Sequence, residues 1–572
     1  MELKRLIDIA AGRQLADLVL KNGRVVNVFT EEILEADVAI AGDRIAGVGS
    51  YEGAETINLE GQFVCPGFID AHVHIESSML SVPEFAKVAA AHGTAAVITD
   101  PHEIANVMGI EGIRYMLESA KGCPLRIYVM LSSCVPASHL ESAGANLSAD
   151  DLRPLLDDPC VLGLAEMMNF PGVVNGDEQV LNKLKMCSGR VIDGHSPGLA
   201  GRDLQAYIAS GIGSDHECTT LEEAREKLRA GQCIMIREGS QAQNLETLLP
   251  LVTPETAHRF MFVTDDKDVE DLLTEGHVDH IIRKAISCGL KPATAIRLAS
   301  INAARYFGLE WFGAVAPGYA ASLAILDNLE DCRVQRVYHE GQLIAEKGRC
   351  VAGESAGPVP VAASTMNVHQ LQPEQFGIKS SGGETQKVHV IEMIEDQLVT
   401  HRCVEALPVV EGLVMPDPSR DIAQLVVIER HGATGRMGFG FIRGFGLRAG
   451  AIASTVAHDA HNIVIAGTNV SDIYEAAVHA VKLRGGLCAV KNGKVLADMP
   501  LPIAGLMSDA PAAEAGKQLS VLQRATTQEL GSTLRKPFMA LSFMSLSVIG
   551  SLKVTDLGLI DVDQFKPIEL FA

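Results

Sequence analysis

Short apolar segments recur eight times between residues 63 and 314, and stretches with helical character separate them. They end near Ile69, Thr99, Leu131, Ala165, Ile192, Ser214, Ile236 and Val263. Helical patterns follow, for example at residues 220–230 and 278–289. Alternation of strand and helix predicts parallel strands, and eight such units over about 250 residues are typical of a (β/α)8 barrel. An open doubly wound sheet is the alternative.

Strand patterns flank this region on both sides. Before it, hairpins are predicted at residues 17–27 around Asn22-Gly23 and at residues 37–46 around Gly42-Asp43. After it, strand patterns return at residues 322–326 and 336–344. We therefore expect an α/β chain in which residues 1–62 plus 315–350 form a composite β-sandwich domain, and the barrel of residues 63–314 is inserted into it.

The rest of the chain predicts a further domain. Residues 350–366 are rich in Gly, Pro, Ala and Ser, which indicates a linker. Residues 367–572 are expected to form a C-terminal α/β domain. Strands are predicted there at 424–429 and 462–466, and a helix at 472–483.

The charge balance limits the class of partner. The 572 residues include 71 acidic and 48 basic ones, a formal charge of -23, which disfavours binding to nucleic acid. No signal-peptide pattern or uninterrupted apolar run of about 18 residues is present, so we expect no membrane span. The twelve cysteines follow no regular framework and predict reduced thiols and a cytoplasmic location. A homo-oligomer is expected, with a dimer favoured.

Residues suited to metal binding follow most of the predicted barrel strands. The pair His72-Val-His74 follows the first strand, and alternate residues of a strand point to the same side, so both imidazoles can hold one metal. Later strands are followed by Glu166, His195, His216 and Asp265. Barrel active sites lie at the carboxyl ends of the strands. Any one of these residues alone could be structural, but their recurrence at one face predicts a metal centre.

This ligand set suits a divalent metal such as Zn, Fe or Mn. Because six ligands exceed the four of a tetrahedral zinc site, we expect two metals, with Glu166 bridging them. His102, Glu103 and Arg237 are expected to contact the ligands or the substrate. In the C-terminal domain, His458 and His461 belong either to a structural turn or to a lid over the barrel mouth.

Several longer runs support a family resemblance. They are Pro66-Gly-Phe-Ile-Asp-Ala-His-Val-His74, Ile75-Glu-Ser-Ser-Met79, Asp100-Pro-His-Glu-Ile-Ala-Asn106, Gly163-Leu-Ala-Glu-Met-Met-Asn169, Asp193-Gly-His-Ser-Pro-Gly198, Ser214-Asp-His-Glu217, Val456-Ala-His-Asp-Ala-His-Asn-Ile463 and Leu501-Pro-Ile-Ala-Gly-Leu-Met-Ser508. Over nearly the whole chain, the sequence resembles the amidohydrolase superfamily and, within it, the bacterial adenine deaminases.

The resemblance implies a set of ligands. Five residues match ligand positions of the superfamily: His72, His74, His195, His216 and Asp265. Glu166 stands where many members have a carbamylated lysine, and such a glutamate is expected in adenine deaminases. The family resemblance favours Mn or Fe over Zn.

The resemblance also implies a reaction, the hydrolysis of adenine to hypoxanthine and ammonia by a metal-activated hydroxide, in purine salvage. Asp265 is expected to accept the proton of the water. Related deaminases supply the acid that protonates the ring from a His-x-x-Glu, which is absent at His195-Ser-Pro-Gly198. Glu217, in preference to Glu238, is expected to take this role, and the alternative for either residue is a salt bridge at the barrel mouth. The alternatives are a hydrolase of other cyclic amides, a sugar deacetylase, and a scaffold without catalysis.

Overall fold

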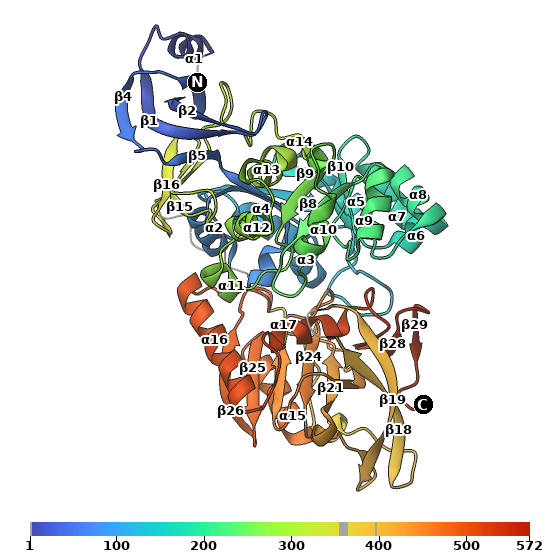
Figure 1. The fold of residues 1–572 in the computed structure, drawn as a ribbon. Coiled ribbons are helices and arrows are strands. Elements are labelled where there is room, and N and C mark those ends of the chain that lie inside the picture. Colours follow the sequence, from blue (N-terminus) through green and yellow to red (C-terminus); the bar gives the residue numbers. More distant parts are fainter. Residues whose placement is uncertain (1–2, 354–363, 395–396) are drawn as a thin grey trace.

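The structure is a computed structural model that describes residues 3–353, 364–394 and 397–572 (Figure 1). Most of the predicted linker at 350–366 lies outside the described residues. In Figure 1 the N-terminal strands and a curled parallel sheet lie above a second body, which the C-terminal residues form. Among the described residues, no helix combines the length and the apolar character needed to cross a bilayer.

The first sheet combines strands from both sides of the central region, in the order β17-β16-β15-β14-β5-β1-β2-β3, with β4 paired to β1. Helix α1 (Leu3–Ala10) precedes it, and the strands are β1 (Ala16–Asn27), β2 (Glu32–Ala41), β3 (Arg44–Gly49), β4 (Gly53–Asn58), β5 (Phe63–Pro66), β14 (Leu323–Leu326), β15 (Val334–His339), β16 (Gln342–Glu346) and β17 (Arg349–Cys350). Strand β5 pairs antiparallel with β14, so the two ends of the inserted region lie side by side.

The predicted hairpin at residues 17–27 is wrong, because these residues form the single strand β1. Asn22 has a φ of 56°, and the pairing of β1 with β2 shifts register between Leu20 and Gly23. At this point β1 also changes its parallel partner from β4 to β5. The Asn-Gly pair therefore bends one strand instead of reversing the chain.

The other strand predictions in this sheet had mixed outcomes. The hairpin at residues 37–46 is confirmed by the antiparallel pair β2 and β3. The strand pattern at 322–326 corresponds to β14. The pattern at 336–344 is two paired strands, β15 and β16, because the chain turns at Glu340 and Gly341, both of positive φ.

Eight parallel strands make up the curled sheet in two hydrogen-bonded sections, β10-β9-β8-β7-β6 and β11-β12-β13, each in chain order without reversal. They are β6 (Phe68–Val73), β7 (Thr94–Thr99), β8 (Arg126–Leu131), β9 (Val161–Met167), β10 (Val191–Gly194), β11 (Ser214–Asp215), β12 (Cys233–Arg237) and β13 (Phe260–Val263). The backbone N–H of Gly213 donates to Ile192 O at 2.9 Å and joins β10 to β11. A parallel bridge between Val73 and Asp265 joins the last strand to the first.

Helices connect these strands. They are α2 (Val82–Ala91), α3 (His102–Met108), α4 (Ile110–Ser119), α5 (Ala149–Leu152), α6 (Phe170–Asn175), α7 (Glu178–Met186), α8 (Gly201–Ala209), α9 (Leu221–Arg229), α10 (Leu245–Leu248), α11 (Val269–Thr274), α12 (Val278–Ser287), α13 (Pro292–Leu298) and α14 (Ile301–Tyr306). Helices α9 and α12 confirm the two helical patterns at 220–230 and 278–289. Strands β6, β7, β12 and β13 are buried along their whole length, as parallel strands covered on both faces must be.

The C-terminal residues form a nine-stranded sheet in the order β20-β19-β18-β22-β21-β24-β23-β25-β26. Its strands are β18 (Thr385–Met393), β19 (Thr400–Val410), β20 (Leu413–Val414), β21 (Ile422–Ile428), β22 (Met437–Arg443), β23 (Ala451–Ser454), β24 (Ile463–Gly467), β25 (Gly486–Lys491) and β26 (Lys494–Pro500). Around it lie α15 (Val470–Lys482), α16 (Ala512–Gln528), α17 (Pro537–Ser542) and the strands β27 (Leu552–Thr555), β28 (Gly558–Asp561) and β29 (Lys566–Ile568).

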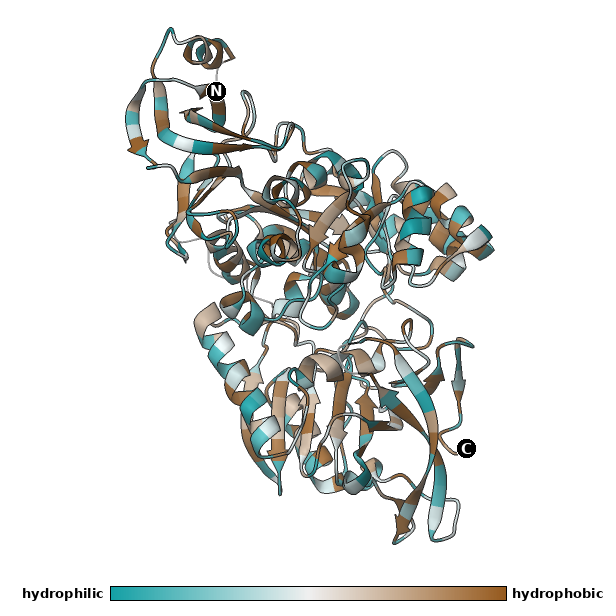
Figure 2. Cartoon of the chain, in the orientation of Figure 1, coloured by the Kyte–Doolittle hydropathy of each residue, from teal (hydrophilic) through white to brown (hydrophobic). Residues whose placement is uncertain are grey.

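Three C-terminal predictions are confirmed by β21, β24 and α15, which lie at the expected residues. Figure 2 shows brown, apolar residues along the strands of this sheet and teal residues on the outer helices α6 to α9. Helix α16 packs against α11, the helix that follows the last parallel strand. Gly516 of α16 allows this close approach, because a Cβ there would lie 2.6 Å from the Leu273 side chain.

Candidate active site

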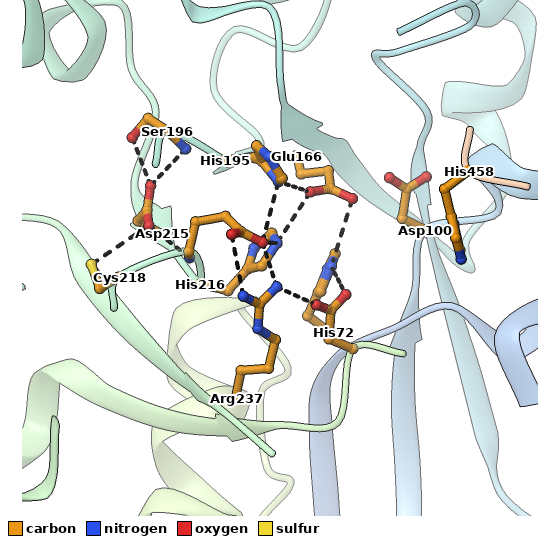
Figure 3. Close-up of polar contacts among 12 residues, drawn as sticks. His72, Asp100, Glu166, His195, Ser196, Asp215, His216, Cys218, Arg237 and His458 are labelled. Atoms are coloured by element: carbon orange, nitrogen blue, oxygen red, sulfur yellow. Dashed lines mark hydrogen bonds and ion pairs between the residues drawn. The ribbon is translucent and has the colours of Figure 1, made fainter. Parts of the chain in front are cut away.

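The six predicted metal ligands converge at the carboxyl end of the curled sheet. Figure 3 shows His72, Glu166, His195 and His216 pointing toward one another. The six ligands are His72 and His74 at the end of β6, Glu166 on β9, His195 after β10, His216 after β11 and Asp265 after β13. Each side chain is buried, with at most 5% of the residue exposed. The strand order alone therefore brings together residues that are up to 193 positions apart, from His72 to Asp265.

Glu166 lies at the centre of the cluster. Its Oε2 is 2.7 Å from His195 Nδ1 and 3.2 Å from His216 Nε2. Its Oε1 is 3.3 Å from His74 Nε2 and 3.4 Å from His102 Nδ1. Burial opposes ionisation of this carboxylate, but the neighbouring His216 and His195 hold its pKa well below the usual range. The two oxygens thus face two different pairs of imidazoles, as a bridging ligand requires.

Asp265 is fixed by the contact that joins the last strand to the first. Its backbone N–H donates to His72 O at 3.0 Å, and its carbonyl accepts from His74 N at 3.1 Å. Its φ of 56° lies in the left-handed region, which few non-glycine residues adopt. The carboxylate Oδ1 lies 3.0 Å from His74 Nε2, and Oδ2 accepts from Arg237 at 2.7 Å. The turn at Asp265, which joins the last strand to the first, therefore also orients this carboxylate toward the histidines.

Asp215 fixes the loops that carry the two histidines after β10 and β11. Its carboxylate accepts hydrogen bonds from Ser196 N at 2.9 Å, Ser196 Oγ at 2.6 Å and Glu217 N at 2.8 Å (Figure 3). Lys227, which is fully buried, neutralises it at 3.1 Å. A buried carboxylate with this many donors is a rigid anchor, so the neighbouring imidazoles are held in place.

The side chains fit divalent metals. Among the groups whose ligand atoms lie within 4.8 Å of one another are His72, His216 and Asp265; Glu166, His195 and His216; and His74, Asp100, His102 and Glu166. Among the described residues, the buried Nε2 atoms of His72 and His195 have no hydrogen-bond partner. A buried nitrogen without a partner is costly, and a metal would satisfy it. Imidazole and carboxylate donors suit Zn, Fe or Mn.

The electrostatics of the cluster favour cations. Burial lowers the pKa of His216, but the Glu166 and Asp265 carboxylates outweigh it and raise the pKa to about 9. The same carboxylates attract any positive charge. A divalent metal therefore displaces protons from these imidazoles when it binds.

Asp100 and His102 join the ligand cluster, although the sequence predicted His102 only as a contact residue and left Asp100 out. His102 Nδ1 lies 3.0 Å from Asp100 Oδ2, and Ser132 Oγ donates to Asp100 Oδ1 at 2.8 Å. The sequence did contain a signal for these two ligands. Asp100-Pro-His102 directly follows β7, just as the other ligands follow their strands.

Glu238 has the contacts of a salt-bridged residue, one of the two roles that the sequence left open for it. Its Oε2 lies 2.7 Å from Lys284 Nζ on α12, and its Oε1 accepts from Leu245 N at 2.9 Å. These two contacts occupy both oxygens. Glu238 is therefore a buried salt-bridge residue that fastens the end of β12 to the helices around it.

Glu217 lies beside the cluster but is fully paired. Arg237 contacts both of its oxygens, with Nη2 at 3.2 Å from Oε2, and the same guanidinium reaches Asp265. Burial opposes ionisation of Glu217, but Arg237 and His195 lower its pKa below the usual value. Figure 3 shows the guanidinium below the ligand cluster. A carboxylate held in this way is a poor proton donor.

The two histidines predicted as a possible lid reach from the C-terminal body to a residue beside the parallel strands. His458 Nδ1 lies 2.7 Å from Oε1 of Glu103, and His461 Nε2 contacts Oε2. Glu103 belongs to α3, next to His102, whose Nε2 is 3.3 Å from Glu103 Oε1. Residues from both bodies therefore meet at the mouth of the sheet.

A cavity of about 600 Å³ opens beside Glu217 and Arg237. Its walls include residues 197–200 and Asn244, together with Leu398 and Ile549 from the C-terminal part. Sites for small molecules are usually a few hundred Å³ with mixed apolar and polar walls, which matches this cavity.

Each of the two bodies matches a different known family. Residues 63–344 match the amidohydrolase family, and residues 397–566 match the adenine deaminase C-terminal domain. The curled parallel sheet with histidine and carboxylate clusters at its mouth thus has the amidohydrolase fold.

Curated relatives that match over nearly the full length identify a more specific family. The chain is 48% identical to an adenine deaminase of Dehalococcoides mccartyi over 99% of this chain and 98% of the relative. It is 47% identical to an adenine deaminase of Desulfatibacillum aliphaticivorans over 99% of both chains, and 46% identical to one of Brucella anthropi over 98% of this chain and 99% of the relative. The chain belongs to the adenine deaminase family.

Proposed function

We propose that this chain hydrolyses adenine to hypoxanthine and ammonia. The observation that carries the proposal is the buried cluster of histidines and carboxylates at the mouth of the sheet, beside a cavity of suitable size. The names of its full-length relatives supply the substrate. The cluster would hold two divalent metals, Mn or Fe in preference to Zn, with Glu166 between them. When bound, such a metal lowers the pKa of water to about 7 and so supplies a nucleophile at neutral pH.

Asp265 would accept the proton of the attacking water. It is buried at the centre of the cluster, and Arg237 at 2.7 Å helps keep it ionised before the reaction. Replacement of the amino group at carbon 6 then requires protons at a ring nitrogen and at the departing ammonia. A second carboxylate near the cavity or the ligands must carry them.

Glu103 is a second candidate for this proton carrier beside Glu217, although His458 and His461 outweigh the effect of burial and hold its pKa well below the usual range. Glu217 is held by Arg237, whereas the contacts of Glu103 among the described residues are with histidines: His102, His458 and His461. Imidazoles exchange protons near neutral pH, and a guanidinium does not. Glu103 therefore has neighbours through which a proton can leave and return.

The remaining expectations also belong to this proposal. We retain the division into a composite β-sandwich domain, a (β/α)8 barrel and a C-terminal α/β domain at the predicted boundaries. A homodimer, a cytoplasmic location and a role in purine salvage stay predictions.

The test is ammonia release from adenine by protein loaded with Mn or Fe, with Glu166→Gln as the variant. The matched control is Glu246→Gln, the same change at a largely exposed side chain. Metal content is measured for all three proteins. We expect release by the wild type and the control, and a loss of both metal and activity in Glu166→Gln, because the amide removes the bridging charge.

Other outcomes separate the parts of the proposal. Activity that survives in Glu166→Gln would remove the bridging role and leave the substrate assignment intact. No ammonia from adenine, despite bound metal, would refute the substrate assignment, and hydantoins and other cyclic amides would then be assayed.

A further inference from the structure

A group of exposed aromatic and aliphatic side chains lies beside the first sheet. Trp311, the only tryptophan of the chain, is 54% exposed, and Leu3 and Ile7 of α1 are 70% and 50% exposed. Tyr319 joins Trp311 to the exposed Phe29, because its ring makes edge-to-face contacts with both, with centroids 5.6 and 5.8 Å apart. We call these five residues the Trp311 face. Large exposed apolar patches of this kind mark interaction surfaces.

A hollow of about 390 Å³ lies on either side of the Trp311 side chain. One is lined by Trp311 together with Leu3 and Leu6 of α1. The other is lined by Trp311 together with Ala304 of α14 and Phe312. The indole is therefore a ridge between two hollows. A surface that carries a ridge and a hollow side by side is suited to pairing with its own copy across a two-fold axis, because each copy then supplies both parts.

The backbone fixes Trp311 in a conformation that a bulky residue rarely adopts. Its φ of 59° lies in the left-handed region. The Trp311 carbonyl accepts a hydrogen bond from Ala320 N at 2.8 Å, and the indole lies over Gly318, where an added Cβ would be 3.5 Å from the ring. Because the side chain is already held in place, a partner that covers it loses little free energy in ordering it.

The charges around the two hollows cancel. The first hollow contains Asp43 and Arg44, and the second contains Arg305 and Glu310. The whole chain has a formal charge of -23, so two copies repel each other over most of their surfaces. At the Trp311 face this repulsion is absent, and a two-fold arrangement allows an arginine of one copy to approach a carboxylate of the other.

We propose that the Trp311 face is the interface of a homodimer, in which Trp311 of each copy enters a hollow of the other. Aromatic residues are enriched in the cores of protein interfaces, and tryptophan is prominent among the residues that dominate their binding energy. Figure 1 shows α1 at the end of the molecule opposite the C-terminal body. Pairing at this end therefore leaves the contact between the two bodies unchanged.

The test is the mass in solution of the full chain and its variants, measured by sedimentation velocity. The variants Trp311→Glu and Ile7→Glu each place a negative charge on an exposed position of the face. The matched control is Val521→Glu, which introduces the same charge on α16 of the C-terminal body, at a helical residue that is 41% exposed. We expect the wild type and the control to have the mass of two chains, and the two variants to have half that mass.

The size of the effect follows from the symmetry. Loss of a dominant interface residue raises Kd by about 30-fold or more, and a two-fold interface contains each residue twice. We therefore expect Trp311→Glu to raise the Kd of the dimer by about 1000-fold, as the product of the two losses.

The single tryptophan also reports on the interface directly. As the concentration of wild type rises and the dimer forms, its emission should move to shorter wavelength and its quenching by iodide should fall. Ile7→Glu keeps Trp311, so its emission should stay that of an exposed indole at concentrations where the wild type is a dimer. Circular dichroism checks that each variant is folded.

Four results would overturn the inference. The first is a wild type that remains a single chain at every concentration, which would exclude a second copy as the occupant. The second is a mass that does not change in Trp311→Glu and Ile7→Glu, and the third is an equal loss of mass in Val521→Glu. The fourth is an emission and quenching of Trp311 that are the same in dimer and monomer. This last comparison needs only the wild type, so it decides the question even if a variant does not fold.

Discussion

Replacing Arg237 by Met should destabilise the protein strongly, because Arg237 neutralises two buried carboxylates. Its guanidinium contacts both oxygens of Glu217 and lies 2.7 Å from Asp265 Oδ2. All three residues are less than 5% exposed, so water cannot take the place of the guanidinium. Methionine fills a similar apolar volume but supplies no charge.

The size of the effect follows from the charges left behind. Removing one partner of a buried ion pair costs about 3–5 kcal/mol, and two carboxylates lose their partner here. For a cooperative unit of 150–250 residues, each kcal/mol shifts the Tm by about 2–4 °C. We therefore expect the Tm of Arg237→Met to lie about 6–20 °C below that of the wild type.

The difference should depend on pH. Although burial acts in the opposite direction, the guanidinium lowers the pKa of Glu217 and Asp265 in the folded state. Stabilisation from a carboxylate with a lowered pKa is present above its unfolded pKa of about 4 and is lost as the pH falls through the folded pKa. The gap in Tm between Arg237→Met and wild type should therefore be full above about pH 5 and narrow below about pH 4.

Calorimetry on metal-free protein is the suitable assay, because no metal charge then compensates for the lost guanidinium. The matched control is Arg126→Met, since Arg126 pairs with Glu340 at the surface, where both side chains are more than a third exposed. Such a pair contributes about 0–1 kcal/mol. A Tm shift in Arg237→Met no larger than in Arg126→Met would refute the charge argument.

Three further predictions concern single titratable groups. Because the carboxylates around His216 raise its pKa to about 9, metal binding at pH 7.5 should release protons, which calorimetry in buffers of different ionisation enthalpy detects. Burial lowers the pKa of Lys553 to about 7, so the unfolded chain binds more protons between pH 7 and 10 and stability rises with pH there. The gain in unfolding free energy from Lys553→Met should consequently be largest at pH 7 or below, and should shrink by up to about 1.4 kcal/mol per pH unit as the pH rises to 10. Glu238→Gln should leave kcat for adenine within about threefold of wild type while lowering the Tm, because Glu238 pairs with Lys284 and not with the ligands; a large loss of kcat without a loss of stability would contradict this placement.

The sequence predicted the parallel strands well because their burial dictates their composition. Strands covered on both faces must be apolar throughout, so β7 and β13 stand out from the polar turns around them. The ligands were found for a related reason, since each directly follows such a strand. At these ligands, the place in the sequence after an apolar strand also gives the place in the structure at the carboxyl end of the sheet.

Prediction failed where tertiary pairing decided the outcome. Asn22-Gly23 has the local chemistry of a hairpin turn, but β4 and β5 pair with successive halves of the same strand and keep it extended. The sequence left open whether Glu238 acts at the site or in a salt bridge, and the partner that pairs with it is Lys284 on a later helix. In both cases the deciding partner lies far along the chain.

Contacts between the two bodies could not be predicted from the sequence either. Nothing local shows that His458 and His461 meet Glu103, which lies about 355 positions earlier. The histidines are visible in the sequence, but their partner depends on how the C-terminal sheet packs on the parallel strands. The sequence therefore left open whether they form a structural turn or a lid.

The shared first sheet has a consequence for synthesis on the ribosome. Strand β5 ends at Pro66, but its neighbour β14 begins at Leu323, after 256 intervening residues. At 5–20 residues per second, the N-terminal strands wait about 13–51 s for this partner. During that interval one edge of β5 is unpaired in the nascent chain, which makes it a site for chaperone binding or for wrong pairing between chains on neighbouring ribosomes.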